Sequence, residues 1–338
     1  MRSPEIQPLI RLGHGGGGTL MRELIDAEFR RLYADPARVL HDASVLADCR
    51  GALAFTVDST VVQPLEFPGG DIGSLAVIGT ANDLAMAGAR ARYLSLAVIL
   101  EEGLPLVLLR RIIASIVRAS RLCGVTIETG DTKVVERGKG DGLFLSTSGI
   151  GVIESPEAID PSRIQAGDRI LVSGDLGRHG LAILACRHGL DLVPPVGSDC
   201  APLWPQVEAL LKRRIPLHCL RDLTRGGLAM VLQELADVGG WCFRIEEEDL
   251  PIAEAVICGC QILGLDPLHL ACEGRFVAFV PASALSAALA VLRPAGGRVI
   301  GTVVNSSGTG LGEVILHTAL QTQRRQQPPS GELLPRIC

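Results

Sequence analysis

Carboxylates recur along the chain beside small residues that would let a ligand approach. Four of them stand in the stretches HDASV, TVDST, ANDLA and GDTK, and a fifth stands in RDLTRGG; these are Asp42, Asp58, Asp83, Asp131 and Asp222. Magnesium prefers hard oxygen ligands and is commonly held by carboxylates together with substrate phosphates. Most Asp residues instead cap helices and turns, which would account for Asp58 or Asp131 taken alone. Asp83 favours a site more strongly, because a carboxylate in an apolar stretch is costly to bury unpaired.

Glycine clusters supply the other requirement of a phosphate site. The run HGGGG at 14–18 precedes a helical pattern, and TRGG at 224–227 opens another, so both offer backbone N–H groups to an anion. GDLGRHG at 174–180 is a third glycine-bounded turn, where Arg178 or His179 could meet an anion. None is a Walker A motif, and a glycine cluster taken alone is more often a linker or turn.

Lys133 in GDTKVV and Glu273 in ACEGRF are candidate proton-transfer groups or phosphate contacts. A Lys or Glu with a shifted pKa can act as an acid or base. Without neighbours to support them, an exposed Lys and a surface ion-pair Glu would be the simpler interpretation.

The periodicity predicts elements that would position these residues. Residues 53–62 read as a strand that delivers Asp58, and residues 74–89 read as a buried helix that carries Asn82 and Asp83. A helix at 19–33, a strand near 93–100 and a helix at 105–124 follow the same logic. Strands are predicted at 125–131 and 143–153, joined by a loop at 132–142 that would hold Lys133.

A second unit begins near residue 160, and its elements repeat the order of the first half. Helices are predicted near 201–213, 225–238, 252–263 and 282–292, with strands in RILVS, WCFRIEE, GRFVAFV, GRVIGTVV and EVILH. We therefore expect an α+β fold, with a doubly wound sheet as the alternative. The predicted domains are 1–160, 161–320 and a flexible tail, 321–338.

Composition limits the function classes. The chain has 338 residues, 47% of them hydrophobic but only 3% aromatic, and a formal net charge of −5. Few rings and no basic patch argue against nucleic acid. No apolar run is long enough for a bilayer span and the N-terminus lacks a secretory signal, so we expect a cytoplasmic protein without a membrane partner. Ten scattered cysteines read as ordinary thiols, and Cys258-Gly-Cys260 is a weak metal signal.

The last cysteine is different, because Cys338 ends a polar, Pro-containing tail, QTQRRQQPPSGELLPRIC. As a coil, these residues would span roughly 20 to 25 Å and could visit more than one site. A frayed terminus with an incidental cysteine is the alternative.

Together these motifs resemble the HypE family of hydrogenase maturation factors, the carbamoyl dehydratases, within the aminoimidazole ribonucleotide synthetase-like (PurM-like) ATP enzymes. The resemblance runs from HGGGG through FPGGDIG, ILEEGLP, GDTKVV, RDLTRGG and EGR to the terminal PRIC, and so covers nearly the whole chain. FPGGDIG, ILEEGLP and PRIC are its most specific parts. The chain departs from the family pattern at His41, where Asp is common, and at Cys272, where Asn is common.

The resemblance implies a two-domain fold, a homodimer, and ATP with Mg in a cleft between domains. It implies that Asp42, Asp58, Asp83 and Asp222 hold metal and phosphate, and that nucleotide contacts come also from Asn82, Asp131, Thr132, Thr224, Arg225, Gly226 and Gly227. Cys338 would receive a carbamoyl group from a HypF-type carbamoyltransferase. Its S-carboxamide would then be dehydrated to a thiocyanate with Lys133 or Glu273 as the base, and passed to a HypC–HypD complex for the iron of nickel-iron hydrogenase.

Two other functions stay open on the residues alone. A small-molecule kinase or ligase of the same superfamily would use the same Asp and Gly motifs, but the PRIC terminus would then have no purpose. A non-catalytic thiol carrier would use the terminus, but Asp83, Asp131, Lys133 and Asp222 would then have none.

Overall fold

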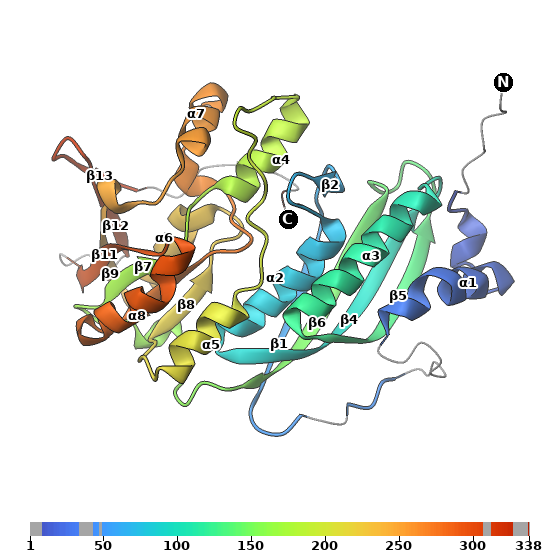
Figure 1. Cartoon of the computed structure of the whole chain (residues 1–338), viewed down its shortest axis with the longest axis horizontal. Coiled ribbons are helices and arrows are strands. Elements are labelled where there is room, and N and C mark those ends of the chain that lie inside the picture. Colours follow the sequence, from blue (N-terminus) through green and yellow to red (C-terminus); the bar gives the residue numbers. More distant parts are fainter. Residues whose placement is uncertain (1–8, 34–42, 47–48, 307–311, 327–336, 338) are drawn as a thin grey trace.

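The computed structural model describes residues 9–33, 43–46, 49–306, 312–326 and 337 (Figure 1). The first half is built on a four-stranded sheet of order β1-β6-β4-β5. Its strands are β1 (Leu53–Thr60), β4 (Ala89–Glu101), β5 (Thr126–Val135) and β6 (Leu143–Ile153). β6 pairs antiparallel with β1 and β4, whereas β4 and β5 are parallel. β1 and β5 are therefore opposite edges of this sheet.

Two helices, α2 (Ile72–Met86) and α3 (Leu106–Cys123), cover one face of the sheet (Figure 1). The side chain of Asp71 starts α2 by accepting from the N–H groups of Gly73 and Ser74 at 2.8 and 2.9 Å. Gly124, with a φ of 67°, ends α3 in the left-handed conformation that glycine favours. The opposite face of β1 stays uncovered in the monomer, where Leu53, Phe55 and Val57 alternate as exposed side chains.

The remaining elements of the first half are short. A hairpin of β2 (Glu66–Phe67) and β3 (Gly70–Asp71) precedes α2. Near the N-terminus, η1 (Leu12–Gly15), α1 (Thr19–Leu24), η2 (Ile25–Phe29) and η3 (Arg30–Leu32) follow one another. Gly15 packs so closely on β5 that a Cβ there would lie 2.9 Å from the Cβ of Val134.

The second half contains a seven-stranded sheet of order β13-β12-β9-β11-β7-β10-β8. The strands are β7 (Arg169–Val172), β8 (Cys219–Asp222), β9 (Trp241–Glu246), β10 (Phe276–Val280), β11 (Arg298–Asn305), β12 (Glu313–His317) and β13 (Gln323–Arg325). The helices are α4 (Arg178–His188), α5 (Trp204–Lys212), α6 (Gly227–Gly239), α7 (Glu254–Leu263) and α8 (Leu285–Leu292). Single 3-10 turns are η4 (Pro161–Arg163), η5 (Glu247–Asp249), η6 (Pro267–His269), η7 (Ala282–Ala284) and η8 (Arg293–Ala295).

The two halves share a hydrophobic core. One cluster joins residues of α2, such as Leu75, to Leu181 and Leu184 of α4 in the other half, and it also contains Ile337. Burial of shared apolar surface resists separation of the halves. The mixture of helices and mainly antiparallel sheets confirms the α+β prediction. No helix among the described residues is long and apolar enough to cross a bilayer.

The sequence misplaced four local features. β5 continues to Val135, so Thr132 and Lys133 lie on a strand and not in a loop; Val134 and Val135 extend the pairing with Leu100 and Glu101. GDLGRHG is not only a turn, because α4 starts directly after Gly177. β8 was missed altogether. In addition, the start of the polar tail pairs with β12 as β13.

Candidate functional site

Three of the aspartates that the motifs singled out meet where α2 adjoins β8. Asp58 comes from β1, Asp83 from α2, and Asp222 from the last position of β8. Asp83 accepts a hydrogen bond from Thr56 Oγ1 at 2.9 Å, and it lines the same cavity as Asp222. Asp58 Oδ2 lies 3.2 Å from where a Cβ on Gly79 would stand, so glycine makes room for that carboxyl against α2.

Burial and neighbouring negative charge raise the pKa values of Asp83 and Asp222. Burial raises the pKa of Asp83, and the charge of Asp58 adds to the effect. Burial also raises the pKa of Asp222 from its ordinary 3.8 to about 7, with the charge of Asp83 as the next cause. Buried like charges favour the neutral form of each. A positively charged ligand would relieve this repulsion.

Glu273 is the fourth carboxyl of the group and the most buried, with 4% of its surface exposed. Burial raises its pKa well above the ordinary range, and Asp222, Asp199, Asp58 and Asp83 raise it further. Its Oε1 has no hydrogen-bond partner among the described residues. An orphaned buried oxygen of this kind needs an explanation, and a functional role is one of the commonest.

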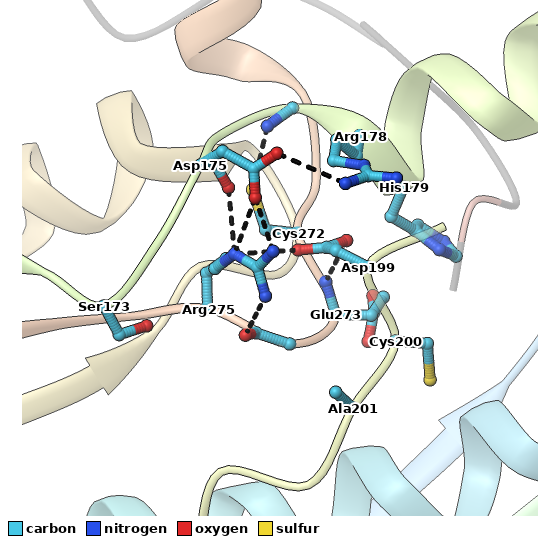
Figure 2. Close-up of polar contacts among 12 residues, drawn as sticks. Ser173, Asp175, Arg178, His179, Asp199, Cys200, Ala201, Cys272, Glu273 and Arg275 are labelled. Atoms are coloured by element: carbon cyan, nitrogen blue, oxygen red, sulfur yellow. Dashed lines mark hydrogen bonds and ion pairs between the residues drawn. The ribbon is translucent and has the colours of Figure 1, made fainter. Parts of the chain in front are cut away.

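An arginine-centred network holds the loop next to Glu273 (Figure 2). Arg275 donates to Asp175, through Nε to the carbonyl at 3.0 Å and through Nη2 to the carboxylate. Its Nε also lies 3.9 Å from Asp199 Oδ2. Asp199 Oδ1 in turn accepts from the N–H of Glu273 at 3.2 Å. The position of Glu273 is therefore fixed through its own backbone.

The thiol of Cys272 serves as a hydrogen-bond acceptor. Sγ accepts from the N–H of Gly177, the N-cap of α4, at 3.1 Å. This hydrogen bond links Cys272, the residue before Glu273, to the start of α4.

Asn82, predicted as a nucleotide contact, joins the two halves of the chain. Its Nδ2 donates to the carbonyls of Ala201 and Glu273 at 3.1 and 3.2 Å, and its Oδ1 accepts from the N–H of Leu203 at 2.8 Å. Its amide is thus occupied at both ends by backbone groups. A nucleotide contact by Asn82 stays a prediction.

The TRGG motif lies beside the aspartates. Thr224 and Arg225 line a cavity of about 480 Å³ together with Asp83 and Asp222. Gly226 and Gly227 have φ values of 76° and 59°, and a Cβ on Gly227 would lie 2.5 Å from two carbonyl oxygens. α6 therefore begins at this cavity without a side-chain cap, which leaves its first N–H groups suited to an anion.

Asp131, Thr132 and Lys133 lie elsewhere. They belong to β5, at the sheet edge opposite β1 and next to the glycine run at η1. Lys133 Nζ donates to Asp131 Oδ1 at 2.9 Å, with the two side chains 63% and 59% exposed. The described residues thus form two groups of predicted site residues, one around Asp83 and one around Asp131, at opposite edges of one sheet.

The carboxyl side chains of Asp58, Asp83 and Asp222 are chemically suited to bind a hard divalent cation. No group of three or more His, Cys, Asp or Glu side chains in the described ranges is already arranged around a metal position. The donors are nevertheless carboxyl oxygens with raised pKa values, which Mg²⁺ would stabilise in their charged form. Asp42, the remaining predicted ligand, lies outside the described residues.

The end of the chain returns to the same region. Ile337 is only 4% exposed, and its carbonyl lies 2.9 Å from Nε2 of the fully buried His179. Figure 2 draws His179 near Asp199, and the two side chains interact electrostatically. Cys338 itself lies outside the described residues.

Sequence reasoning missed Thr56, Asp199 and Arg275. Asp199 stands in the irregular stretch GSDCAP, and Arg275 stands within ACEGRF, a motif in which only Glu273 was a candidate. Thr56 alone carried a signal, because it stands two residues before Asp58 on the same strand and therefore on the same face.

Comparison with known proteins identifies the family of this chain. The N-terminal and C-terminal domain models of AIR synthase related proteins match residues 40–153 and 165–312. The carbamoyl dehydratase HypE of Rhodobacter capsulatus is 47% identical, over 97% of this chain and 98% of its own. A crystal structure of HypE in complex with ATP has a TM-score of 0.93 at 46% identity, covering 97% of this chain and 99% of that one.

The chain also resembles HypE as seen in a HypE–HypF complex, with a TM-score of 0.78 at 38% identity, covering 92% of this chain and all of that one (100%). These relatives are matched over nearly their full length. The chain belongs to the HypE family of carbamoyl dehydratases, built from the two AIR synthase related domains.

Proposed function

We propose that this protein uses ATP to dehydrate an S-carboxamide on its own Cys338 to a thiocyanate, the source of cyanide ligands for the iron of nickel-iron hydrogenase. One observation carries the proposal: Ile337 is anchored inside the fold at His179, beside the loop that fixes Glu273. A tail that returns to a buried carboxyl cluster fits a tethered substrate. It does not fit a thiol merely displayed to partners.

The chemistry balances as follows. Transfer of the γ-phosphoryl group of ATP to the carboxamide oxygen, with loss of one N–H proton, gives a phosphorylated S-imidate. Loss of the second N–H proton then expels phosphate and leaves S–C≡N, with ADP as the other product. Phosphorylation turns a poor leaving group into a good one, and the tether supplies a high effective concentration.

Glu273 is the better placed of the two candidate bases. It is buried, has a raised pKa, and presents an oxygen without a partner among the described residues. A base works best when its pKa lies near the operating pH. Lys133 is exposed and already paired with Asp131 at the far edge of the sheet. We therefore assign the removal of the N–H protons to Glu273.

The remaining carboxyls fit the nucleotide. Asp58, Asp83 and Asp222 would hold Mg²⁺ with the phosphates, and Asp42 would join them. Bound Mg²⁺ would supply neutralisation of the charge that develops during phosphoryl transfer. Thr224, Arg225 and the start of α6 would contact the phosphates across the same cavity.

Three partners follow. The relative solved as a HypE–HypF complex supports a HypF-type carbamoyltransferase as the donor of the carbamoyl group. A HypC–HypD complex would accept the product. The exposed apolar face of β1, with Phe55 71% and Val57 63% exposed, supports a homodimer, because such a continuous apolar stripe is normally covered.

The mass of the C-terminal peptide tests the function. The full-length protein is loaded with carbamoyl groups, incubated with ATP and Mg²⁺, and cleaved after Glu332 to release residues 333–338. We expect this peptide to lose one water only when ATP is present. A Cys338→Ala variant should bind ATP but show no modified peptide. An unchanged peptide mass in the wild type, alongside normal ATP binding, would refute the proposal.

A further inference from the structure

His179 is held on both ring nitrogens. Nε2 lies 2.9 Å from the carbonyl oxygen of Ile337, and Nδ1 lies 2.8 Å from Ser198 Oγ. The carbonyl can only accept, so Nε2 carries the proton and Nδ1 accepts from the Ser198 hydroxyl. Burial lowers the pKa of His179, in agreement with this neutral tautomer.

The ring is also fixed by packing. His179 is fully buried at the second position of α4, and the ring of Phe67 meets it edge-on with the centroids 5.5 Å apart. Ser198 accepts from the N–H of Cys200 at 3.1 Å, which orients its hydroxyl. The series of hydrogen bonds therefore runs in one direction: Cys200 donates to Ser198, Ser198 donates to His179, and His179 donates to the carbonyl of Ile337.

The last acceptor in this series of hydrogen bonds is the carbonyl oxygen of Ile337, which belongs to the peptide bond that joins Ile337 to Cys338. The segment that orients His179, residues 198–201, also fixes the dehydration site. Asp199 accepts from the N–H of Glu273, and the carbonyl of Ala201 accepts from Asn82. One short segment thus sets the position of the tail relative to Glu273.

We propose that His179, oriented by Ser198, is the positioning residue that docks the Ile337–Cys338 peptide bond and thereby presents the modified thiol for dehydration. The inference rests on the proposed function. His179 exchanges no proton with the substrate in this role. It acts by limiting where the thiol can go, and misplacement of a tethered group costs rate without changing nucleotide binding.

The test is a single-turnover measurement on the full-length protein. Its thiols are S-carbamoylated with potassium cyanate at mildly acidic pH, so that loading needs no partner, and the fraction of peptide 333–338 that loses water is followed after addition of ATP and Mg²⁺. His179→Leu should slow this reaction about tenfold or more, because one buried hydrogen bond and the placement that depends on it are lost. ATP binding should stay at the wild-type level.

Two further variants separate positioning from folding. His179→Gln keeps an N–H donor at about the reach of Nε2 and should recover most of the rate. Ser198→Ala leaves the imidazole but removes the donor to Nδ1, and should slow the reaction by a few fold. His188→Leu, at an exposed position of the same helix, is the matched control and should react like the wild type.

A second readout does not depend on catalysis. Alkylation of unloaded Cys338 by iodoacetamide, followed in the same peptide, should be faster in His179→Leu and normal in His179→Gln. If the wild type loses no water, the proposed function fails and the alkylation result still decides the docking. If the wild type reacts and both His179→Leu and Ser198→Ala lose water at the wild-type rate, the role of His179 is overturned. It is also overturned if His179→Gln loses water no faster than His179→Leu. Should His179→Leu not fold, Ser198→Ala and His179→Gln decide.

Discussion

Asp83 on α2 and Asp222 at the end of β8 line one cavity at the junction of the two halves of the chain, and after burial the charge of Asp83 is the next cause of the raised pKa of Asp222. Two buried carboxyls this close share one proton more easily than they carry two charges. Without a ligand the pair opposes the folding that brings it together. When a cation binds, it neutralises the two carboxylates, and the pair then stabilises the contact between the two halves of the chain.

The first prediction concerns stability against pH. Asp222 has a native pKa of about 7 and an ordinary value of 3.8, so between these values the native state binds more protons than the unfolded state. The contribution of Asp222 to the free energy of unfolding should therefore fall as pH rises from about 4 to about 7 and stay low above that. Urea unfolding of the ligand-free protein should show a flatter pH profile in Asp222→Asn, with the variant more stable by about 1–3 kcal/mol at pH 8. Asp249→Asn, at an exposed turn, should leave the profile unchanged.

The second prediction concerns proton release. Because a cation stabilises the charged carboxylates, binding of ATP with Mg²⁺ should displace protons held by Asp83 and Asp222. Apparent affinity should rise between pH 6 and pH 8. Calorimetry in buffers of different ionisation enthalpy should detect the released protons in the wild type and fewer in Asp222→Asn. Equal proton release in both proteins would show that Asp222 does not meet the ligand.

The third prediction separates the two candidate bases. Glu273→Gln removes the proton acceptor but keeps the shape, and should slow water loss from the C-terminal peptide by about 10²- to 10⁴-fold while ATP binding is retained. The variant should be at least as stable as the wild type, since a buried carboxyl is replaced by a neutral amide. Lys133→Met, which breaks an exposed ion pair, should affect stability little. A Lys133→Met variant that binds ATP normally and yet loses no water would move the base to Lys133.

The fourth prediction concerns the uncovered face of β1. Phe55→Glu places a charge in the apolar stripe and should dissociate the homodimer, because burial of an unpaired carboxylate is unfavourable. Sedimentation velocity over a range of concentrations would measure this. Glu154→Gln, just beyond β6, serves as the control. A wild type that stays monomeric at high concentration would remove the homodimer from the proposal.

The sequence predicted the local elements well because their apolar periodicity is strong. The helix that carries Asn82 and Asp83 and the strand that carries Asp58 are where the pattern put them. The convergence of Asp58, Asp83 and Asp222 followed only from the family resemblance, since spacing along the chain does not report contact between α2 and β8. The separation of these aspartates from Asp131 could not be predicted from the sequence either, because the order of strands in a sheet depends on pairing between distant strands.

The supporting residues could not be predicted. Asp199 and Ser198 act from a stretch without helix or strand, where no period marks the buried side. His179 was noted only as a possible anion contact, because its partner Ile337 is 158 residues away in the sequence. The tail, read as polar and flexible, contributes β13 and a buried Ile337. Leu333, Leu334 and Ile337 are the aliphatic residues of this polar segment, and their spacing shows no period that would predict docking.

The last prediction concerns Cys272, the residue that precedes Glu273. Its Sγ is the acceptor for the N–H of Gly177, and the thiol is buried, so Cys272→Ala would leave that donor without a partner. An unsatisfied buried donor costs about 1–3 kcal/mol, and we expect the free energy of unfolding in urea to fall by that amount. Cys272→Ser retains an acceptor oxygen and should lose less. Cys186→Ala removes an exposed thiol from the helix that Gly177 begins, and should unfold like the wild type. If Cys272→Ala were as stable as the wild type, the bond to Gly177 would contribute nothing, and the start of α4, with His179 one residue further on, would be fixed by packing alone.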